Sequence, residues 1–198
     1  MHPEVFKAFD EICRAHPVRG SVLEIGATPD ASTLLNLPAL AGAAAKIGVN
    51  LAGPSQFGDF TIRQADANDL ALFPDRHFDT VLCNATLEHD RVFWRTLAEI
   101  RRVARPGALV VLGTPGYAEL PGEPRRRRWL SRWAWLSGRP DGWPLQHSTL
   151  TLAVHNYPGD YYRFSEQAFR EVFFEGMTGV VIRTVLIPPR ILGFGFRR

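Results

Sequence analysis

Short apolar runs alternate with segments of helical periodicity along most of the chain. Strand-like runs lie at 21–26, 46–50, 60–64, 78–84 and 108–113. The clearest helical pattern falls between the last two runs, where Phe93, Leu97, Ile100 and Ala104 recur at helical spacing. This alternation is typical of a mostly parallel sheet covered by helices on both faces. We therefore predict an α/β fold with a Rossmann-like, doubly wound sheet.

Three segments depart from this alternation. A weak apolar stripe over 34–44 contains Pro38, which predicts a helix that is short or bent there. The segment 51–60 is rich in glycine and proline, so we expect a loop in place of the usual crossover helix. Two β-rich runs at 180–187 and 191–196 predict an antiparallel hairpin at one edge of the sheet.

The best-defined helix carries its own end signals. Asp90 is expected as its N-cap and Pro106-Gly107 as its end. Arg95 and Glu99 stand four residues apart and are expected to form an ion pair on the solvated face. A second helix is predicted over 165–174.

Composition narrows the class of protein. With 198 residues, 45% apolar and 22% charged, the chain suits one globular domain and excludes disordered or fibrous classes. Cys13 and Cys83 are too few for a disulfide framework and show no metal-ligand spacing with the histidines, so we expect a reducing compartment and no metal. No leader or bilayer-spanning run is apparent, which predicts a cytoplasmic location.

The net charge of +3 is concentrated in an arginine- and tryptophan-rich segment and at the final two residues. As a helix, that segment would place Trp129 and Trp133 on one face, with Arg125, Arg128 and Arg132 on or beside it. This arrangement suits peripheral contact with a membrane or an anionic, partly apolar substrate. A solvated loop whose tryptophans pack on the domain is equally open. Nucleic acid is not expected as a partner because the patch is short.

A ligand site is predicted where the first strand-like run stops. The run ends at Gly26, with Glu24 just before it. In open α/β sheets ligands bind beyond the carboxyl ends of the strands, where a glycine lets the backbone come close. Glu88-His89 closes the run 78–84 at the same edge, either near a substrate or simply as a helix-entry pair.

Four motifs then occur in an order found in one large family. They are VLEIGA (22–27), QADANDLALFPDRHFDTVLCNATLEH (64–89), EIRRVARPGALVVLGTPG (99–116) and GDYYRFS (159–165). Over about 21–116, and more weakly in its last third, the chain resembles the class I S-adenosylmethionine-dependent methyltransferases, with a type 11/12-like domain. The resemblance implies methyl transfer to a small-molecule or a carbohydrate- or lipid-linked acceptor. The length of the chain predicts one domain over 1–198, in which 117–163 would form an inserted lid or a segment that contacts the substrate or a partner.

The resemblance assigns roles to individual residues. Glu24, Gly26 and Ala27 would line the methionine end of S-adenosylmethionine, Asn50 would face the ribose, Asp66 and Ala67 would hold the adenine, and Asn84, Ala85 and Leu87 would lie beneath the sulfonium. For an oxygen or nitrogen acceptor, His89 is the first candidate base, and Asp160 or Tyr161 the second.

Two departures from the family pattern keep other functions open. Only the first of three alternating glycines is present, and Asn50 stands where the family usually has an acid. The second change predicts cofactor binding weaker by about 1–2 kcal/mol. One alternative is a methyltransferase-like module without turnover that binds a partner or membrane through the arginine–tryptophan segment. A nicotinamide-dependent reductase ranks last because its glycine fingerprint and acidic strand end are missing.

Overall fold

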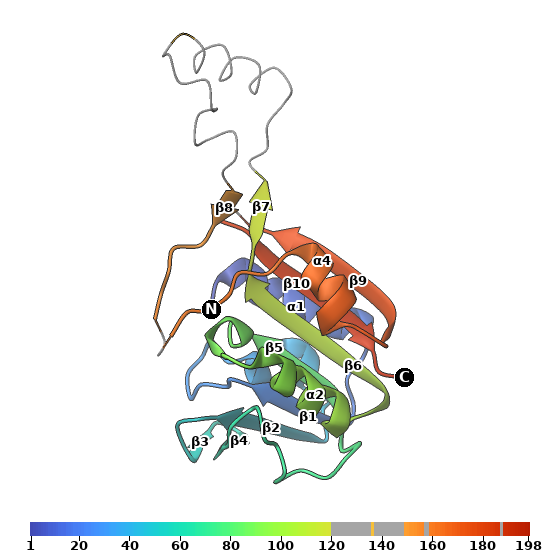
Figure 1. The fold of residues 1–198 in the computed structure, drawn as a ribbon. Coiled ribbons are helices and arrows are strands. Elements are labelled where there is room, and N and C mark those ends of the chain that lie inside the picture. The colour runs from blue at the N-terminus through green and yellow to red at the C-terminus, as the bar shows by residue number, and fades with distance from the viewer. Residues whose placement is uncertain (120–135, 137–148, 157–158, 187) are drawn as a thin grey trace.

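A single mixed sheet forms the centre of the molecule (Figure 1). The computed structural model describes residues 1–119, 136, 149–156, 159–186 and 188–198. The strands of the sheet are β1 (Ser21–Ile25), β2 (Ala45–Asn50), β3 (Ser55–Phe57), β4 (Phe60–Gln64), β5 (Phe78–Asn84), β6 (Ala104–Pro115), β9 (Thr178–Val185) and β10 (Arg190–Phe196). They lie in the order β3-β4-β2-β1-β5-β6-β10-β9. The neighbouring strands from β4 to β6 in this order pair in parallel. The pairings of β3 with β4, of β6 with β10 and of β10 with β9 are antiparallel, and this mixed sheet confirms the predicted fold class.

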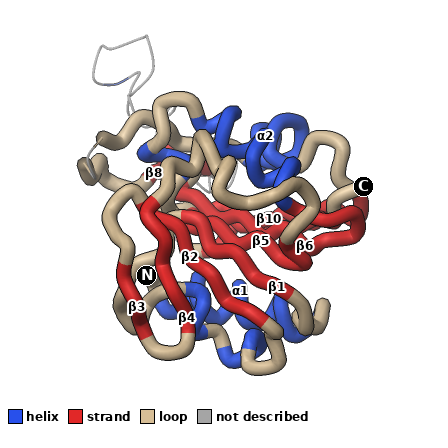
Figure 2. Tube along the Cα trace, turned by 90° about the horizontal axis from the view of Figure 1, so that it is seen from below, coloured by secondary structure: helices blue, strands red, loops and turns tan. Residues whose placement is uncertain are grey.

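Apolar layers cover both faces of this sheet. Helix α1 (Pro3–Ala15) lies on one face and helix α2 (Phe93–Val103) on the other (Figure 2). In β5, Leu82 packs in the α1 layer, whereas Val81 and Cys83 pack in the α2 layer. Successive side chains of a strand point to opposite faces, so burial of both faces explains the unbroken apolar run.

Helix α1 was not predicted from the sequence. Its buried residues Val5, Phe9 and Ile12 recur at helical spacing and face the sheet. Pro3 opens the helix, and the His2 side chain caps it by accepting a hydrogen bond from the Glu4 N–H. Proline suits the first turn because its backbone nitrogen needs no acceptor there.

The end signals of α2 were partly wrong. The helix begins at Phe93, and Asp90 stands too early to be its N-cap, yet its carboxylate accepts from the Val92 N–H (2.9 Å) and the Thr96 hydroxyl (2.7 Å). Glu99 pairs with Arg102 at 2.8 Å and not with Arg95. The helix ends at Val103, and Pro106-Gly107 lies inside β6.

Other predictions hold in outline and need correction in detail. The segment 51–60 contains no helix, as expected, but it holds β3, which pairs antiparallel with β4. The stripe at 34–44 forms two 3₁₀ turns, η1 (Leu34–Asn36) and η2 (Pro38–Leu40). The predicted hairpin is confirmed as β9 and β10.

The helix predicted at 165–174 begins as α4 (Glu166–Ala168), capped by Ser165, and continues as a π-helical turn, η5 (Phe169–Phe173). A second, two-stranded sheet of β7 (Tyr117–Glu119) and β8 (Thr149–Thr151) stands beside the main one (Figure 1). Among the described residues, no helix combines the length and the apolar character needed to cross a membrane. Arg125, Arg128, Trp129, Arg132 and Trp133 lie outside the described residues.

Candidate active site

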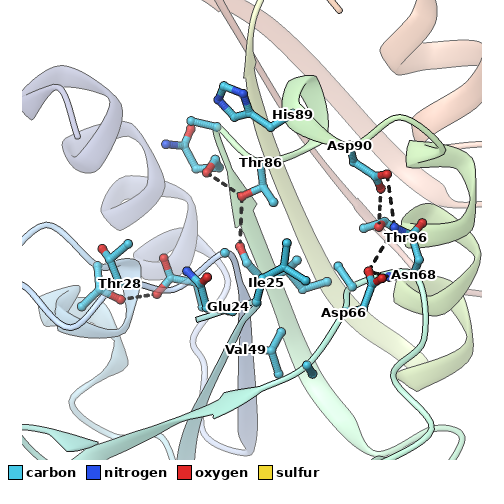
Figure 3. Close-up of a pocket in the computed structure, with 18 of the residues that line it drawn as sticks. Glu24, Ile25, Thr28, Val49, Asp66, Asn68, Thr86, His89, Asp90 and Thr96 are labelled. Atoms are coloured by element: carbon cyan, nitrogen blue, oxygen red, sulfur yellow. Dashed lines mark hydrogen bonds between the residues drawn. The ribbon is translucent and has the colours of Figure 1, made fainter. Parts of the chain in front are cut away.

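A cavity of about 580 Å³ opens at the carboxyl ends of β1, β2, β4 and β5. Figure 3 shows Glu24 and Thr28 at one side of it, Asp66 and Asn68 at the other, and His89 above them. Of the predicted cofactor-binding residues, seven line the cavity: Glu24, Gly26, Asn50, Asp66, Ala67, Asn84 and Ala85. Ala27 and Leu87 are instead fully buried in the apolar layers on opposite faces of the sheet. The cavity lies at the edge of the sheet that the sequence pattern indicated.

Gly26 brings the backbone close to the cavity. Its φ is +79°, and a Cβ at this position would lie 2.1 Å from the Thr86 hydroxyl oxygen. A side chain is therefore excluded both by the backbone conformation and by space. Ala85, which also lines the cavity, has a positive φ of 51°. Non-glycine residues in this conformation carry strain and concentrate at functional sites.

The carboxylate of Glu24 forms its hydrogen bonds with other residues of the protein. The carboxylate is 4% exposed and accepts hydrogen bonds from the Thr33 hydroxyl and from the N–H groups of Leu34 (3.0 Å) and Leu35 (3.2 Å). These bonds tie the η1 turn to the end of β1. Burial outweighs the three hydrogen bonds and raises the pKa of Glu24 to about 7.

Asn50 links the two places where the chain departs from the family pattern. Its side-chain amide donates to the Ala27 carbonyl at 2.8 Å, and its side-chain oxygen accepts from the Ala52 N–H at 3.1 Å. Ala27 belongs to the loop that lacks the second and third glycines. A carboxylate cannot donate a hydrogen bond to a carbonyl. Asparagine at position 50 therefore stabilises the altered loop in a way that the usual acid cannot.

The opposite wall is a polar network that the sequence analysis largely missed. Asp66 Oδ1 accepts from both the backbone N–H (2.9 Å) and the side-chain amide (3.1 Å) of Asn68. That amide also donates to Asp90 at 3.2 Å, and Asp90 accepts from Thr96 at 2.7 Å. All four residues line the cavity. The sequence feature that could have indicated this network is the presence of polar residues just beyond two strand ends.

The three candidate catalytic residues lie in different surroundings. His89, in the 3₁₀ turn η3 (Leu87–His89), and Tyr161 line the cavity. The Nδ1 of His89 is 2.5 Å from the Gly159 carbonyl oxygen, and the Tyr161 hydroxyl accepts from Arg91 at 3.0 Å.

Asp160 does not line the cavity. Its carboxylate forms an ion pair with the Arg163 guanidinium and accepts from the His155 N–H at 2.8 Å. Hydrogen bonding to Arg163 holds the pKa of Asp160 well below its usual range. Such a carboxylate is a poor base near neutral pH. Asp160 therefore joins His155 to Arg163.

Glu88 was noted only as the neighbour of His89, and the structure gives it a distinct environment. Its side chain is 0% exposed, and neither carboxylate oxygen has a hydrogen-bond partner among the described residues. Burial raises its pKa to about 7. The His89 ring lies near this carboxyl group, with its Nε2 3.7 Å from Oε1.

Comparisons with known proteins agree with this architecture. Residues 36–112 match the family model described as a methyltransferase domain. No curated protein matches the chain. Burkholderia thailandensis 1,6-didemethyltoxoflavin-N1-methyltransferase, solved with 1,6-didemethyltoxoflavin and S-adenosylhomocysteine, is similar at 17% identity and a TM-score of 0.64, covering 97% of this chain and 77% of that one.

Two further solved structures show the same likeness. Haemonchus contortus phosphoethanolamine N-methyltransferase 2, with phosphomonomethylethanolamine and S-adenosylhomocysteine, has 12% identity and a TM-score of 0.64 and covers 98% of this chain and 52% of that one. The N-methyltransferase NodS of Bradyrhizobium japonicum, with S-adenosylhomocysteine, has 12% identity and a TM-score of 0.59 over 98% and 86%. At these identities the likeness establishes the fold.

The class of protein follows from these findings together. The chain has the fold of the class I S-adenosylmethionine-dependent methyltransferases, and residues 36–112 match the model of a methyltransferase domain. The resemblance read from the four sequence motifs is thereby confirmed, and the comparisons support the prediction of a methyltransferase.

Proposed function

We propose that this chain transfers the methyl group of S-adenosylmethionine to a small-molecule acceptor. The observation that carries the proposal is the cavity at the carboxyl ends of the parallel strands, where the end of β1 presents the backbone of Gly26, a position at which Thr86 and the backbone conformation exclude a side chain. Neighbours of the same fold are solved with S-adenosylhomocysteine and with small acceptors, which supports this choice of cofactor and acceptor class. A carbohydrate- or lipid-linked acceptor stays a prediction.

The lining residues fit the parts of this cofactor. Asp66 offers a carboxylate for the exocyclic amine of adenine, and Ala67 follows it on the same wall. Asn50 lies at the end of β2, where the ribose would bind, and the methionine end would lie against Gly26. Bound S-adenosylmethionine supplies a methyl group on a positively charged sulfur. The protein's own part is to orient that group and to exclude water around it.

The acceptor would enter from the side of His89 and Tyr161. Both line the cavity, and both are held by bonds to other segments, His89 to Gly159 and Tyr161 to Arg91. Positioned groups of this kind lower the entropic cost of bringing an acceptor to the reacting methyl. The predicted lid at 117–163 falls mostly outside the described residues, so its role stays a prediction.

Calorimetric titration with S-adenosylhomocysteine tests the proposal directly. The native chain is expected to bind one equivalent, and Gly26→Ala to weaken binding at least tenfold because the new methyl group meets Thr86. Gly107→Ala is the matched control. Gly107 has nearly the same φ, +82°, but an added Cβ there meets nothing within 4 Å. Absence of binding to the native chain, or equal affinities in the two variants, would contradict the proposal.

A module that binds without turnover is the second candidate. The observation that favours it is Asn50, whose amide is committed to Ala27 and Ala52 and leaves less hydrogen-bonding capacity for a ribose. Incubation with methyl-labelled S-adenosylmethionine and fractionated cell extract separates the two functions. Label that enters an extract fraction with the native chain, and not with Gly26→Arg, supports the enzyme. Binding without any transfer supports the module.

A further inference from the structure

Three side chains that commonly bind metals meet beside the cavity. Glu88 and His89 come from η3, and His155 comes from a segment far along the chain. One donor atom from each lies within 4.8 Å of the other two. The Glu88 Oε1 to His89 Nε2 distance is 3.7 Å, and the two imidazole rings are 5.0 Å apart and nearly perpendicular. Donor atoms about 2 Å from one ion in a tetrahedral arrangement lie about 3.3 Å from each other. The Glu88–His89 separation is close to this value, and small side-chain movements would bring His155 to it.

From this arrangement we propose that Glu88, His89 and His155 bind a divalent transition-metal ion at the acceptor side of the cavity. No spacing of residues along the chain indicated a metal, because His155 lies far from the Glu88-His89 pair in the sequence. Only the fold brings the three together.

The state of Glu88 is the second, independent observation. Its carboxyl group is 0% exposed, and neither oxygen has a hydrogen-bond partner among the described residues. A buried polar group without partners destabilises the fold, and a buried charge does so more strongly. A cation held between Glu88 and the two imidazoles would satisfy the carboxylate at the position where it faces His89.

The two rings present the correct nitrogen atoms for binding. The Gly159 carbonyl, 2.5 Å from His89 Nδ1, can only accept, so the proton lies on Nδ1 and Nε2 keeps its lone pair. His155 Nδ1 lies 3.3 Å from the Ala153 carbonyl oxygen and 3.5 Å from Asp160 Oδ2. Metal-binding histidines usually donate their other N–H to a carbonyl or carboxylate in this way.

The positive charges of two neighbouring arginines do not provide the Glu88 carboxylate with a hydrogen-bond partner. Arg163 and Arg190 both face Glu88 and interact with its charge. The Arg163 guanidinium is bonded to Asp160 and to the carbonyl groups of Leu152, Ala153 and Tyr162. Neither arginine donates a hydrogen bond to Glu88. A protonated, metal-free Glu88 is the competing explanation, and the test below separates the two.

The ligand set indicates the class of ion. Two imidazoles and one carboxylate suit Zn²⁺, Co²⁺ or Fe²⁺, whereas Mg²⁺ and Ca²⁺ prefer oxygen ligands alone. Three protein ligands leave at least one coordination position open. Because His89 also lines the cavity, that position suits an oxygen of the acceptor, an extension that rests on the proposed methyl transfer.

The test is a calorimetric titration of the full chain, first treated with a chelator, with Zn²⁺ and without any cofactor. One ion per chain is expected to bind. Glu88→Gln keeps the size of the buried side chain, and His155→Gln changes an exposed side chain, so both variants should fold. Each variant is expected to weaken Zn²⁺ binding at least tenfold. The absorption spectrum of the Co²⁺-loaded native chain should differ from that of each Co²⁺-loaded variant. Mg²⁺ is expected to bind more weakly than Zn²⁺.

The control is His2→Asn, which removes an exposed imidazole and keeps a side chain able to cap α1. Unchanged Zn²⁺ affinity is expected in this variant. The proposal is overturned by absence of Zn²⁺ binding, or by binding that Glu88→Gln and His155→Gln leave intact. If Glu88→Gln is more stable than the native chain and binds Zn²⁺ equally well, the Glu88 carboxyl group is simply protonated in the native chain. Because no cofactor is present, the result is independent of whether the chain binds S-adenosylhomocysteine.

Discussion

The carboxyl group of Glu24 is deeply buried and contacts three hydrogen-bond donors at the wall of the cavity. Burial disfavours the charged form and raises the pKa of Glu24 to about 7, above the value of 4.5 expected for an unfolded chain. Between these two values the folded state binds more protons than the unfolded state. The contribution of Glu24 to stability is therefore complete below about pH 4.5 and is lost as the pH rises through about 7.

Glu24→Gln removes this titration, and its effect on stability should depend on pH. The free energy of unfolding of the native chain, minus that of the variant, is expected to fall by about 3 kcal/mol between about pH 4.5 and pH 7.5. Urea unfolding at a series of pH values measures this difference. Glu11→Gln, at an exposed position, provides the control. A flat profile for Glu24→Gln would show that the carboxyl ionises normally despite its burial.

At single positions, the sequence identified strand ends better than side-chain partners. Gly26, Asp66 and Asn84 follow directly from the apolar runs that precede or contain them, and all three line the cavity. The bond from Asn50 to the Ala27 carbonyl could not be predicted, because it depends on how the loop after β1 turns. The ion pair with Arg163 makes Asp160 less basic, and the role of Asp160 as a base stays a prediction.

Among the helices, α2 is attached to the segment that follows β4 through the side chains of Arg102 and Glu99. Arg102 forms ion pairs with Glu99 and Asp75, each at 2.8 Å, and donates to the carbonyl groups of Leu70 (2.9 Å) and Phe73 (3.0 Å). Glu99 in turn accepts from the Leu70 N–H at 2.7 Å. The segment held in this way begins just after the cavity residues Asp66 and Ala67.

Arg102→Ala should therefore loosen this segment as well as destabilise the fold. We expect a loss of about 2 kcal/mol in the free energy of unfolding, since charge-assisted bonds are lost from a site partly screened by solvent. Arg95→Ala, on the exposed part of the same helix, should change stability by less than about 0.5 kcal/mol. Urea unfolding measures both variants, and faster amide exchange at 68–75 should accompany only the first. Equal effects of the two substitutions would contradict this role of Arg102.

Elements with strong periodicity were predicted well, and those defined by tertiary contacts were not. The strand at 78–84 agrees with β5 at both ends because both of its faces are buried. Strand β3 has three residues and exists only through its pairing with β4. The π-helical turn at Phe169–Phe173 depends on aromatic packing against Phe93 and Phe164, which no local pattern encodes.

Across the whole molecule, one sheet is shared by two apolar layers. Phe9 of α1 is fully buried in one layer, and Phe169 of η5 is fully buried in the other. Each strand of the centre contributes side chains to both layers in alternation. Neither layer can therefore lose its packing without exposing residues on strands that the other layer needs.

Phe9→Ala and Phe169→Ala test this coupling as a matched pair. Each should lower the free energy of unfolding by about 3–5 kcal/mol through lost burial and a residual cavity. Both variants should still unfold in a single transition, with coincident far- and near-ultraviolet dichroism. A cofactor analogue at about 100 times its dissociation constant should add about 2.7 kcal/mol to each. Separate transitions for the two dichroism signals in either variant would mean that the layers unfold independently.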